Sequence, residues 1–303
     1  MENYQVLGWL GEGAHGVVMK ARCRRTDDLV AIKKIPHKTG DAAGFPCATF
    51  REMKAIQHLE HENVIRLLDV VASSGGVVLV LELLRCNLST LIHNPERPLN
   101  EAHVKCCMRM LLKGLGHCHA MGILHRDLKP TNLLVNSRGI LKLADFGLAC
   151  LDSKDREKSA CVATRWYRAP ELLYGAQDYG SGIDLWAAGC VLAEMLNGSP
   201  LFRGESDIEQ LCLVIKALGT PNQRTWPGLA QLPDYSKITF PESEALPWRD
   251  LLPDVGRSSR DLVKGFLVYD PLSRLSCSQA LLHPFFWSEP LPSDPGSLPL
   301  PSE

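Results

Sequence analysis

The N-terminal part of the chain is patterned mainly as short strands. Apolar, β-branched runs interrupted by glycine or aspartate occur at positions 6–10, 16–21, 30–35 and 77–81. Such runs between turn residues are typical of strands. A helix is predicted at 49–59, where apolar residues recur at helical spacing beside charged neighbours. The pattern therefore predicts a small lobe, residues 1–84, that is rich in β-structure.

After Arg85 the apolar positions follow the period of an α-helix. They are spaced by three or four residues at Val104, Cys107, Met108, Leu111, Leu112 and Leu115. This spacing predicts an amphipathic helix. The stretches 184–196, 207–218 and 259–268 are patterned as further helices, and the first is apolar enough to be buried. We therefore expect a helical lobe over residues 85–286 and an α+β fold.

The end of the chain has a different composition. Its final fifteen residues contain five prolines and almost no large apolar side chains. Proline-rich segments of this kind adopt extended conformations, so we predict that residues 287–303 form a tail. Prolines of such a tail could dock in an aromatic groove of a partner, but the tail lacks a basic flank, which favours a simple linker.

The bulk composition sets limits on the class of protein. The 303 residues are 45% hydrophobic and 22% charged, as is ordinary for a globular protein. The net charge is −1, whereas a dedicated nucleic-acid-binding protein carries an excess of basic residues. No apolar run approaches the roughly 20 residues of a membrane span, and we see no secretory signal. Eleven scattered cysteines without a C-x-x-C pair favour free thiols inside the cell.

A glycine-rich string, Gly11-x-Gly13-x-x-Gly16-x-Val18, lies between the first two predicted strands. Alone, this string fits a dinucleotide-binding fingerprint, a phosphate-binding loop or an ordinary turn. A dinucleotide fingerprint leads into a helix, whereas a strand, a turn and another strand follow here. Because glycines let backbone N–H groups approach a phosphate closely, this context favours a phosphate loop.

The third predicted strand carries Lys33 in the run Val-Ala-Ile-Lys. Its place after the glycine loop makes Lys33 a candidate ligand for phosphate oxygens. A lysine in a cleft needs an acidic partner to offset its desolvation, and Glu52 on the predicted helix can supply one. The simpler alternative is an exposed salt bridge worth less than about 1 kcal/mol.

Further motifs follow the amphipathic helix: His-Arg-Asp-Leu-Lys-Pro-Thr-Asn at 125–132, Asp-Phe-Gly at 145–147 and Ala-Pro-Glu at 169–171. Together with the glycine loop and Lys33, they occur in the order and spacing of the eukaryotic protein kinases. The chain therefore resembles a eukaryotic protein kinase over about residues 4–286. The resemblance implies a bilobal fold with a nucleotide cleft between the lobes.

The resemblance also implies roles for residues of the second lobe. Asp145 and Asn132 match the Mg²⁺ ligands, which are hard oxygen donors. Asp127 matches the catalytic base that orients the substrate hydroxyl, and Lys129 would neutralise the transferred phosphate. Lys129 favours serine and threonine substrates, because tyrosine kinases lack a lysine at that place. Thr164 is expected to bond near Asp127 and Lys129.

The expected cofactors are ATP and Mg²⁺, bound between the lobes, with Lys33 and Glu52 in the catalytic set. Backbone groups of Glu82 and Leu84 would bind the adenine edge, next to a gatekeeper at Leu81. The expected ATP-binding residues are Leu10, Gly11, Gly13, Gly16, Val18, Ala31, Lys33, Glu82, Leu84 and Leu134. The aliphatic members would also suit an ordinary core, and both roles are compatible because an adenine pocket is apolar.

Within the kinases, the run Ala-Thr-Arg-Trp-Tyr-Arg-Ala-Pro-Glu at 163–171 resembles the cyclin-dependent and mitogen-activated kinases. The cyclin-dependent branch is favoured, because the activation segment has no Thr-x-Tyr and the run Pro-Cys-Ala-Thr-Phe-Arg-Glu at 46–52 lies where that branch contacts cyclin. This resemblance implies a cyclin or cyclin-like activator and protein substrates phosphorylated at Ser/Thr-Pro. It also implies structural supports at Asp184 and at a Glu171–Arg274 ion pair.

Regulation is expected to depart from the family pattern. Ser159 occupies the place of the activating phosphothreonine, and Arg51 and Arg126 match two of the three arginines around that phosphate. Cys150 occupies the third place, so phosphorylation of Ser159 should order the segment less well. The alternative is that Ser159 is only a solvated loop serine. A redox-sensing role for Cys150 is disfavoured, because Lys154 is the only basic residue close after it.

The leading hypothesis is an active kinase that works in cell-cycle or ciliary signalling. The alternative is a partner-dependent, pseudokinase-like scaffold with weak activity. A complete catalytic set disfavours the scaffold: Lys33, Glu52, Asp127, Asn132 and Asp145. Ala14 and His15 replace the Thr-Tyr pair of inhibitory phosphorylation, so we expect that switch to be absent. We expect the protein in the cytoplasm and nucleus, with the cilium as an alternative location.

Overall fold

A five-stranded antiparallel sheet forms the N-terminal lobe in the computed structural model, which describes residues 3–13, 16–36, 47–73, 76–153 and 158–301. The strand order is β1-β2-β3-β5-β4. The strands are β1 Tyr4–Gly13, β2 Gly16–Cys23, β3 Leu29–Pro36, β4 Leu67–Ser73 and β5 Gly76–Glu82. The four predicted strands are confirmed, and β4 at the sheet edge is an addition to them.

The β1–β2 hairpin provides the strand–loop–strand context that distinguishes the glycine string from a dinucleotide site. Its register ends with Gly13 opposite Gly16. Gly16 has φ +143, and a Cβ there would collide with the backbone carbonyl of Lys34 on β3, so glycine is required for this close packing of strands. Residues 14 and 15, which carry the predicted loss of the inhibitory switch, lie outside the described residues.

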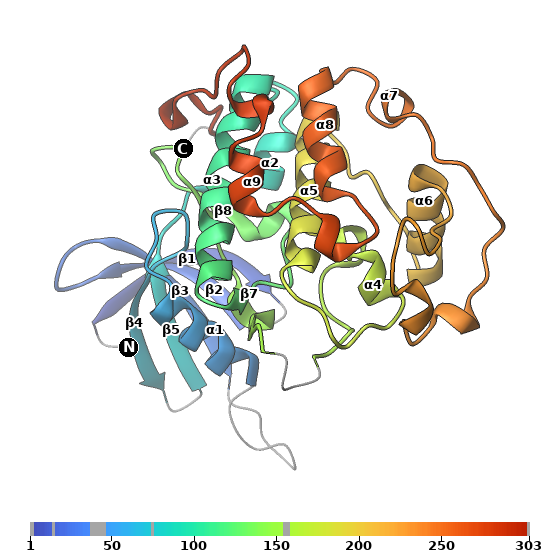
Figure 1. Cartoon of the computed structure of the whole chain (residues 1–303). Helices are drawn as coiled ribbons and strands as arrows, with labels where there is room; N and C mark the ends of the chain where they lie inside the picture. The colour runs from blue at the N-terminus through green and yellow to red at the C-terminus, as the bar shows by residue number, and fades with distance from the viewer. Residues whose placement is uncertain (1–2, 14–15, 37–46, 74–75, 154–157, 302–303) are drawn as a thin grey trace.

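Helix α1, Cys47–His58, lies where the sheet meets the second lobe (Figure 1). Its Ala55 and Ile56 are buried, which agrees with the apolar spacing that predicted a helix here. The observed helix begins two residues before the predicted start and ends one residue before the predicted end. Pro46, the first residue of the expected activator-contacting run, lies outside the described residues.

The C-terminal lobe is mainly helical. Its helices are α2 Leu88–Ile92, α3 Glu101–Ala120, α4 Pro170–Leu173, α5 Gly182–Asn197, α6 Asp207–Leu218, α7 Trp248–Leu251, α8 Arg257–Phe266 and α9 Cys277–Leu281. Short strands complete it: β6 Cys86–Asn87, β7 Ile123–Leu124, β8 Leu133–Val135, β9 Leu141–Leu143 and β10 Cys150–Leu151. In the described parts of the chain, none of these helices could serve as a membrane span.

Two helices of this lobe position the site. α3 is the predicted amphipathic helix, and it starts earlier than its apolar pattern because the Asn100 side chain accepts the N–H of His103 and caps it. α5 is buried along nearly its whole length, as its apolar run predicted. These two helices form the support on which the loop at 125–132 lies.

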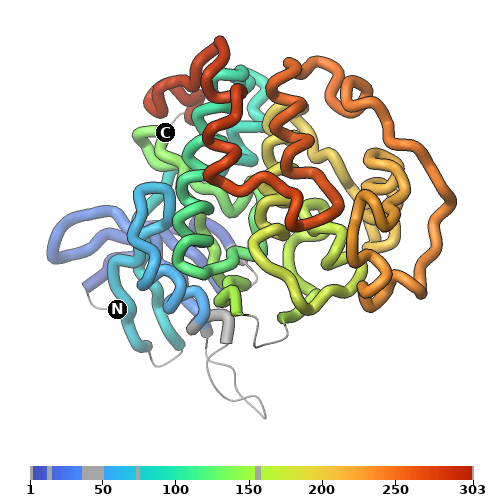
Figure 2. Tube along the Cα trace, viewed as in Figure 1, coloured from blue at the N-terminus to red at the C-terminus, as the bar shows by residue number. Residues whose placement is uncertain are grey.

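The proline-rich end of the chain lies beside α3, as Figure 2 shows for the red C-terminal segment. The Ser293 N–H donates to the carbonyl of Ala102 at 3.0 Å. The Nζ of the buried Lys105 donates to the carbonyls of Ser288 and Pro290, at 2.9 Å each. The predicted extended tail instead contains a short turn at Pro295–Ser297 and is anchored by α3 and by the buried Leu298, which the sequence pattern did not indicate.

Candidate active site

A cluster of three charged residues lies between the lobes. The Nζ of Lys33 on β3 is 2.8 Å from both carboxylate oxygens of Glu52 on α1 and 3.1 Å from Oδ1 of Asp145. Burial alone would lower the pKa of Lys33, but the two carboxylates outweigh it and raise this pKa above its ordinary value. The partner expected for Lys33 is in place, and the pair is buried rather than exposed.

The Asp145-Phe146 turn is strained and tightly held. Asp145 has a left-handed backbone with φ 60, which is costly for a residue with a Cβ. Phe146 is buried and packs on the His125 ring, with centroids 4.8 Å apart. These contacts fix one conformation of the turn, in which the Asp145 carboxylate reaches Lys33. Phe146 and His125 contribute packing here, as expected.

Asp127 is the centre of a second network. Thr164 donates to Oδ1 of Asp127 from its N–H at 2.9 Å and from Oγ1 at 2.8 Å. The Nζ of Lys129 is 2.8 Å from Oδ2 of Asp127 and also donates to Oγ1 of Thr164 at 2.8 Å. The Nδ2 of Asn132 donates to Oδ2 of Asp127 at 2.9 Å. The structure thus brings together four residues that the sequence analysis expects near the substrate.

The Asp127 carboxylate is held in its charged form. Burial alone would raise the pKa of Asp127, but the contacts from Lys129 and Thr164 outweigh it, so this pKa lies below its ordinary value. An ionised carboxylate only accepts hydrogen bonds. Asp127 can therefore orient a substrate hydroxyl and take its proton as the transfer proceeds.

The donor set beside Asp127 fits a magnesium ion that accompanies ATP. Asp145 offers carboxylate oxygens, while Asn132 uses its amide nitrogen for Asp127 and so presents its amide oxygen as a ligand. Mg²⁺ in phosphate sites takes one or two such hard donors, and water and phosphate oxygens complete its shell. Among the described residues, no separate group of three His, Cys, Asp or Glu side chains could hold a metal.

The expected adenine-binding side chains belong to, or pack against, the large apolar core that runs through both lobes. Ala31 and Leu81 belong to it, while Val18 of the sheet and the C-lobe residue Leu134 pack against it, and Ala31 lies opposite Leu81 in the β3–β5 register. Both interpretations of these aliphatic residues therefore agree with the packing. The other expected residues of the nucleotide loop lie beside them on β1 and β2: Leu10, Gly11, Gly13 and Gly16.

The chain crosses between the lobes at Glu82–Leu84. Oε1 of Glu82, at the end of β5, accepts the N–H of Arg66 at 2.8 Å and lies 2.9 Å from Nζ of Lys142 on β9. The contact with Lys142 joins the lobes, so the Glu82 side chain is engaged and only its main-chain groups are left for the predicted adenine contact. Leu84 packs against the core that continues into the C-lobe.

Two structural supports are present as expected. The buried carboxylate of Asp184 accepts the backbone N–H groups of His125 and Arg126, at 2.9 and 2.8 Å. Glu171 and Arg274 form a buried two-point ion pair, at 2.6 and 2.7 Å. Asp184 therefore fixes the backbone just before Asp127, and the ion pair ties the segment after the activation loop to the C-lobe.

The residues expected to regulate the kinase are only partly assembled. The buried Arg126 donates from Nε to the carbonyl of Leu148 at 2.6 Å and from Nη1 to the hydroxyl of Tyr179 at 2.8 Å. That hydroxyl donates to the backbone carbonyl of Ser159 at 2.6 Å, and Ser159 itself is exposed. Arg126 is thus connected to the Ser159 backbone through Tyr179.

A lysine that sequence reasoning missed completes this region. The Nζ of the buried Lys158 donates to the carbonyl of Tyr179 at 2.8 Å and lies 3.4 Å from Oδ1 of Asp152. Arg126 and Lys158 both act to lower the pKa of Cys150, but burial, the largest effect, raises it, which disfavours a reactive thiol. A single lysine in an irregular loop has no periodic signal, so only the fold places it beside Cys150.

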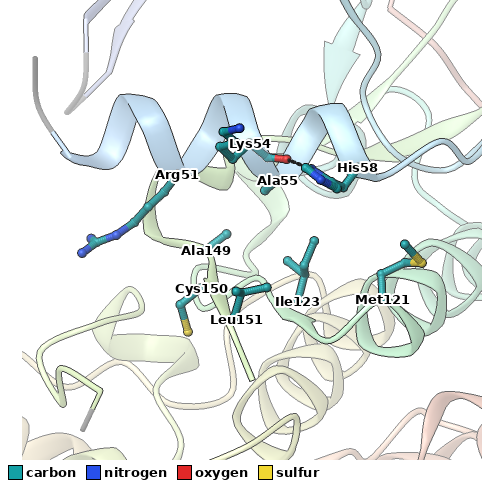
Figure 3. A pocket seen from close by; sticks show the side chains of 9 residues that line it. All are labelled: Arg51, Lys54, Ala55, His58, Met121, Ile123, Ala149, Cys150 and Leu151. Carbon is teal, nitrogen blue, oxygen red and sulfur yellow. Dashed lines mark hydrogen bonds between the residues drawn. The ribbon is translucent and has the colours of Figure 1, made fainter. Parts of the chain in front are cut away.

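Arg51 and Cys150 both line a cavity of about 460 Å³ between α1 and the strands β7 and β10 (Figure 3). Lys54 and His58 line the same side from α1. Figure 3 shows the Arg51 side chain pointing away from the apolar lining. The apolar lining residues are Ala55, Met121, Ile123, Ala149 and Leu151.

Comparison with known proteins supports the family assignment. A family model described as the protein kinase domain matches residues 4–286. Cyclin-dependent kinase 20 of Danio rerio and of Homo sapiens are 52% and 49% identical to this chain, over 99% of it and 88% of each relative. Cyclin-dependent kinase 7 of Xenopus laevis is 41% identical, over 99% of this chain and 86% of that relative.

A solved structure supports the same class. A chain of the CAK complex from Chaetomium thermophilum bound to ATP-gamma-S has a TM-score of 0.92 and 36% identity, covering 99% of this chain and 96% of its own length. This chain therefore belongs to the protein kinase family, with the two-lobed fold that the sequence predicted. Within that family it is a serine/threonine kinase of the cyclin-dependent type, similar over nearly its whole length to cyclin-dependent kinase 20.

Proposed function

We propose that this kinase transfers the γ-phosphate of ATP to serine or threonine hydroxyls of proteins, with Asp127 as the base. The network of Lys129, Thr164 and Asn132 on its carboxylate carries this proposal, because it holds an ionised acceptor where a hydroxyl can approach. Lys33, held by Glu52, would bind the ATP phosphates, and Asn132 and Asp145 would hold Mg²⁺. Bound Mg²⁺ neutralises charge on the phosphates.

The role of Lys129 can be tested directly. Lys129→Ala removes the cation beside the transferred group, so we expect kcat to fall about 100-fold with little change in the dissociation constant for ATP. Lys34→Ala, which removes an exposed lysine next to Lys33 on β3, is the control and should keep kcat near that of the wild type. A Lys129→Ala variant with unchanged kcat would remove Lys129 from the proposed mechanism.

We propose that the substrate residue after the phosphoacceptor is proline. Ala163 has a left-handed backbone with φ 64, and Arg168 donates to the carbonyls of Val162 and Ala163 at 3.0 Å each. Because these acceptors are already occupied, a substrate N–H placed there would lose its partner. Proline has no N–H to lose. A peptide library with no preference for proline at this position would contradict the proposal.

We propose that a cyclin or cyclin-like activator binds the face around α1. The cavity there combines an apolar lining with the basic residues Arg51, Lys54 and His58, so a partner with an apolar side chain between acidic residues would complement it. Leu151→Asp, at a leucine 69% exposed, should reduce activation by the co-purified partner. Leu282→Asp, at a leucine just after α9 that is 76% exposed and does not line this cavity, should not. Equal activation of the two variants would contradict this site.

We further propose phosphorylation of Ser159, with Arg126 and Arg51 as its partners. Support comes from the exposure of Ser159 and from the link of its backbone to Arg126 through Tyr179.

We also propose that the kinase works in cell-cycle or ciliary signalling. The proposed location is the cytoplasm and nucleus, with the cilium as an alternative, and this proposal rests on the family resemblance. Affinity purification of the tagged protein, with identification of its bound partner, tests the pathway.

A further inference from the structure

The turn Arg165–Tyr167, which directly follows Thr164, is attached to the start of α6 by side chains from both of its ends. At one end, Nε of Arg165 donates to Oδ1 of Asp207 at 2.8 Å. At the other end, Nη1 of Arg168 donates to both carboxylate oxygens of Asp207, at 2.8 Å each. One carboxylate therefore receives two guanidinium groups of the activation segment.

Asp207 is itself held in place by its helix. It is the first residue of α6, which Ser206 caps by accepting the N–H of Glu209 at 3.1 Å. The fixed start of α6 thus gives the carboxylate a defined position. The Asp207 side chain is 51% exposed, whereas that of Arg168 is only 12% exposed. Exposed ion pairs add little stability, so orientation of Arg168 is the main physical effect of this contact.

The orientation of Arg168 matters because its guanidinium binds α6 with one nitrogen and the substrate-facing loop with the other two. Nη1 binds Asp207, while Nε and Nη2 bind the carbonyls of Val162 and Ala163. Because the guanidinium is planar and rigid, it cannot turn without breaking its hydrogen bonds to Asp207 and to the two carbonyls. The carboxylate of α6 and the occupied carbonyls of the substrate-facing loop are therefore mechanically linked through Arg168.

We propose that Asp207 is a positioning residue for the choice of the substrate residue that follows the phosphoacceptor. It holds Arg168 so that the carbonyls of Val162 and Ala163 stay occupied. Without Asp207, Arg168 is released, the carbonyls become acceptors for a substrate N–H, and residues other than proline are tolerated. This inference rests on the proposed preference for proline.

The experiment compares two peptides that differ only in proline or alanine after the phosphoacceptor serine. The quantity compared is kcat/KM for the proline peptide divided by kcat/KM for the alanine peptide. In Asp207→Ala this ratio should fall about tenfold, the size of effect expected for one released hydrogen-bond acceptor. The change should come mainly from a better KM for the alanine peptide. Asp207→Glu, which can rebuild the two-point contact, should restore much of the ratio.

Arg165→Ala is the matched control, because it removes the other guanidinium from Asp207 and leaves the Arg168 contact intact. It should keep the wild-type ratio, and all variants should keep their melting temperature within a few degrees. A wild-type ratio near one would overturn both the proline preference and this inference. A wild-type preference that survives unchanged in Asp207→Ala, or an equal loss in Arg165→Ala, would overturn the role of Asp207 alone.

Discussion

Three residues with side chains and left-handed backbones lie in the reaction centre or next to it: Arg126 with φ 66, Asp145 with φ 60 and Ala163 with φ 64. Each such conformation costs about 1 kcal/mol, and each is held by contacts made elsewhere. The Arg126 N–H is held by Asp184, the Asp145 carboxylate by Lys33, and the Ala163 carbonyl by Arg168. Strain here fixes the direction of reacting groups.

At this scale the sequence predicted the residue types well, because phosphoryl transfer restricts them and motifs keep their spacing. Lys33 with Glu52, and Asp127 with Lys129 and Thr164, come together as the family resemblance implied. Lys158 and Asp207 could not be predicted in this way. Their contacts join segments that only the folded chain brings together, and a lone charge in a loop has no pattern.

The pH dependence of stability tests the contacts of Asp184. Burial alone would raise the pKa of Asp184, but a hydrogen bond from His119 and the backbone N–H groups outweigh it and lower this pKa. A lowered folded-state pKa gives stability that is present above the unfolded value, near 3.9, and is lost as pH falls through the folded value. Asp184→Asn should therefore cost about 2–3 kcal/mol, equally at pH 7 and pH 5.

The measurement is urea unfolding of Asp184→Asn against its parent, both carrying His119→Gln. That background replaces the imidazole of His119, which lies 3.0 Å from the carboxylate, with an amide that can still donate a hydrogen bond. The difference in the free energy of unfolding should stay constant from pH 7 to pH 5 and shrink only below about pH 4. A difference that already shrinks between pH 7 and pH 5 would show that the pKa of Asp184 is raised instead.

Among the elements, those with a strong apolar period were predicted best. α6 has the predicted bounds, and α3 and α5 differ from the predicted stretches only at their ends. β4 escaped prediction because Asp69 breaks its apolar run, and a register shift lies beside that residue. The anchoring of the tail was also missed: Lys105 binds carbonyls of residues 288 and 290, and the isolated Leu298 is buried in the core without any apolar period around it.

A pair of glycines tests how firmly the tail is attached. Gly139 and Gly122 both have left-handed backbones, with φ +80 and φ +67, but a Cβ on Gly139 would collide with the carbonyl of Pro295 and a Cβ on Gly122 would meet nothing within 4 Å. Gly122→Ala should cost about 1 kcal/mol, from backbone strain alone. Gly139→Ala should cost more and should speed amide exchange at Ser293 in the tail.

The comparison is made by thermal unfolding and by hydrogen exchange. The Ser293 N–H is a suitable reporter, because it donates to the carbonyl of Ala102 on α3 and loses protection when the tail detaches. Equal stability losses in the two variants, with tail exchange unchanged in both, would mean that the tail contact at Gly139 is not maintained in solution.

The activation segment offers a prediction at the same scale. The Nζ of Lys158 donates to the carbonyl of Tyr179, and the hydroxyl of Tyr179 donates to the carbonyl of Ser159, so both contacts hold the segment. Lys158→Met should therefore lower kcat of the dephosphorylated kinase about tenfold, as expected for loss of a buried, charge-assisted hydrogen bond. Ser159→Ala should have a smaller effect, and Cys150→Arg should increase the gain in activity that Ser159 phosphorylation produces.

The assay uses each variant after phosphatase treatment and again after phosphorylation, together with the co-purified partner. Equal activity of wild type, Ser159→Ala and Cys150→Arg in both states would remove the proposed role of the missing arginine. Full activity of Lys158→Met would remove the role of Lys158, whatever the result at Ser159.

For the whole molecule, the lobes are joined by contacts of several kinds. Lys33 of the sheet reaches Asp145 of the C-lobe, and Glu82 reaches Lys142. The Ile65 N–H donates to the carbonyl of Leu143 on β9 at 2.9 Å. Within the N-lobe, Glu52 on α1 holds Lys33 in this position. With the catalytic groups of both lobes in contact, this chain has the assembled site of an active kinase rather than that of a scaffold.

The most direct test of this account is phosphotransfer from γ-labelled ATP by the protein purified with its bound partner. We expect label on serine or threonine of a protein substrate, and at least a 100-fold loss, on the order typical for a general base, in Asp127→Ala. ATP and Mg²⁺ should still bind to that variant. A wild-type protein that binds ATP and Mg²⁺ but transfers no more phosphate than Asp127→Ala would contradict the account and identify a scaffold.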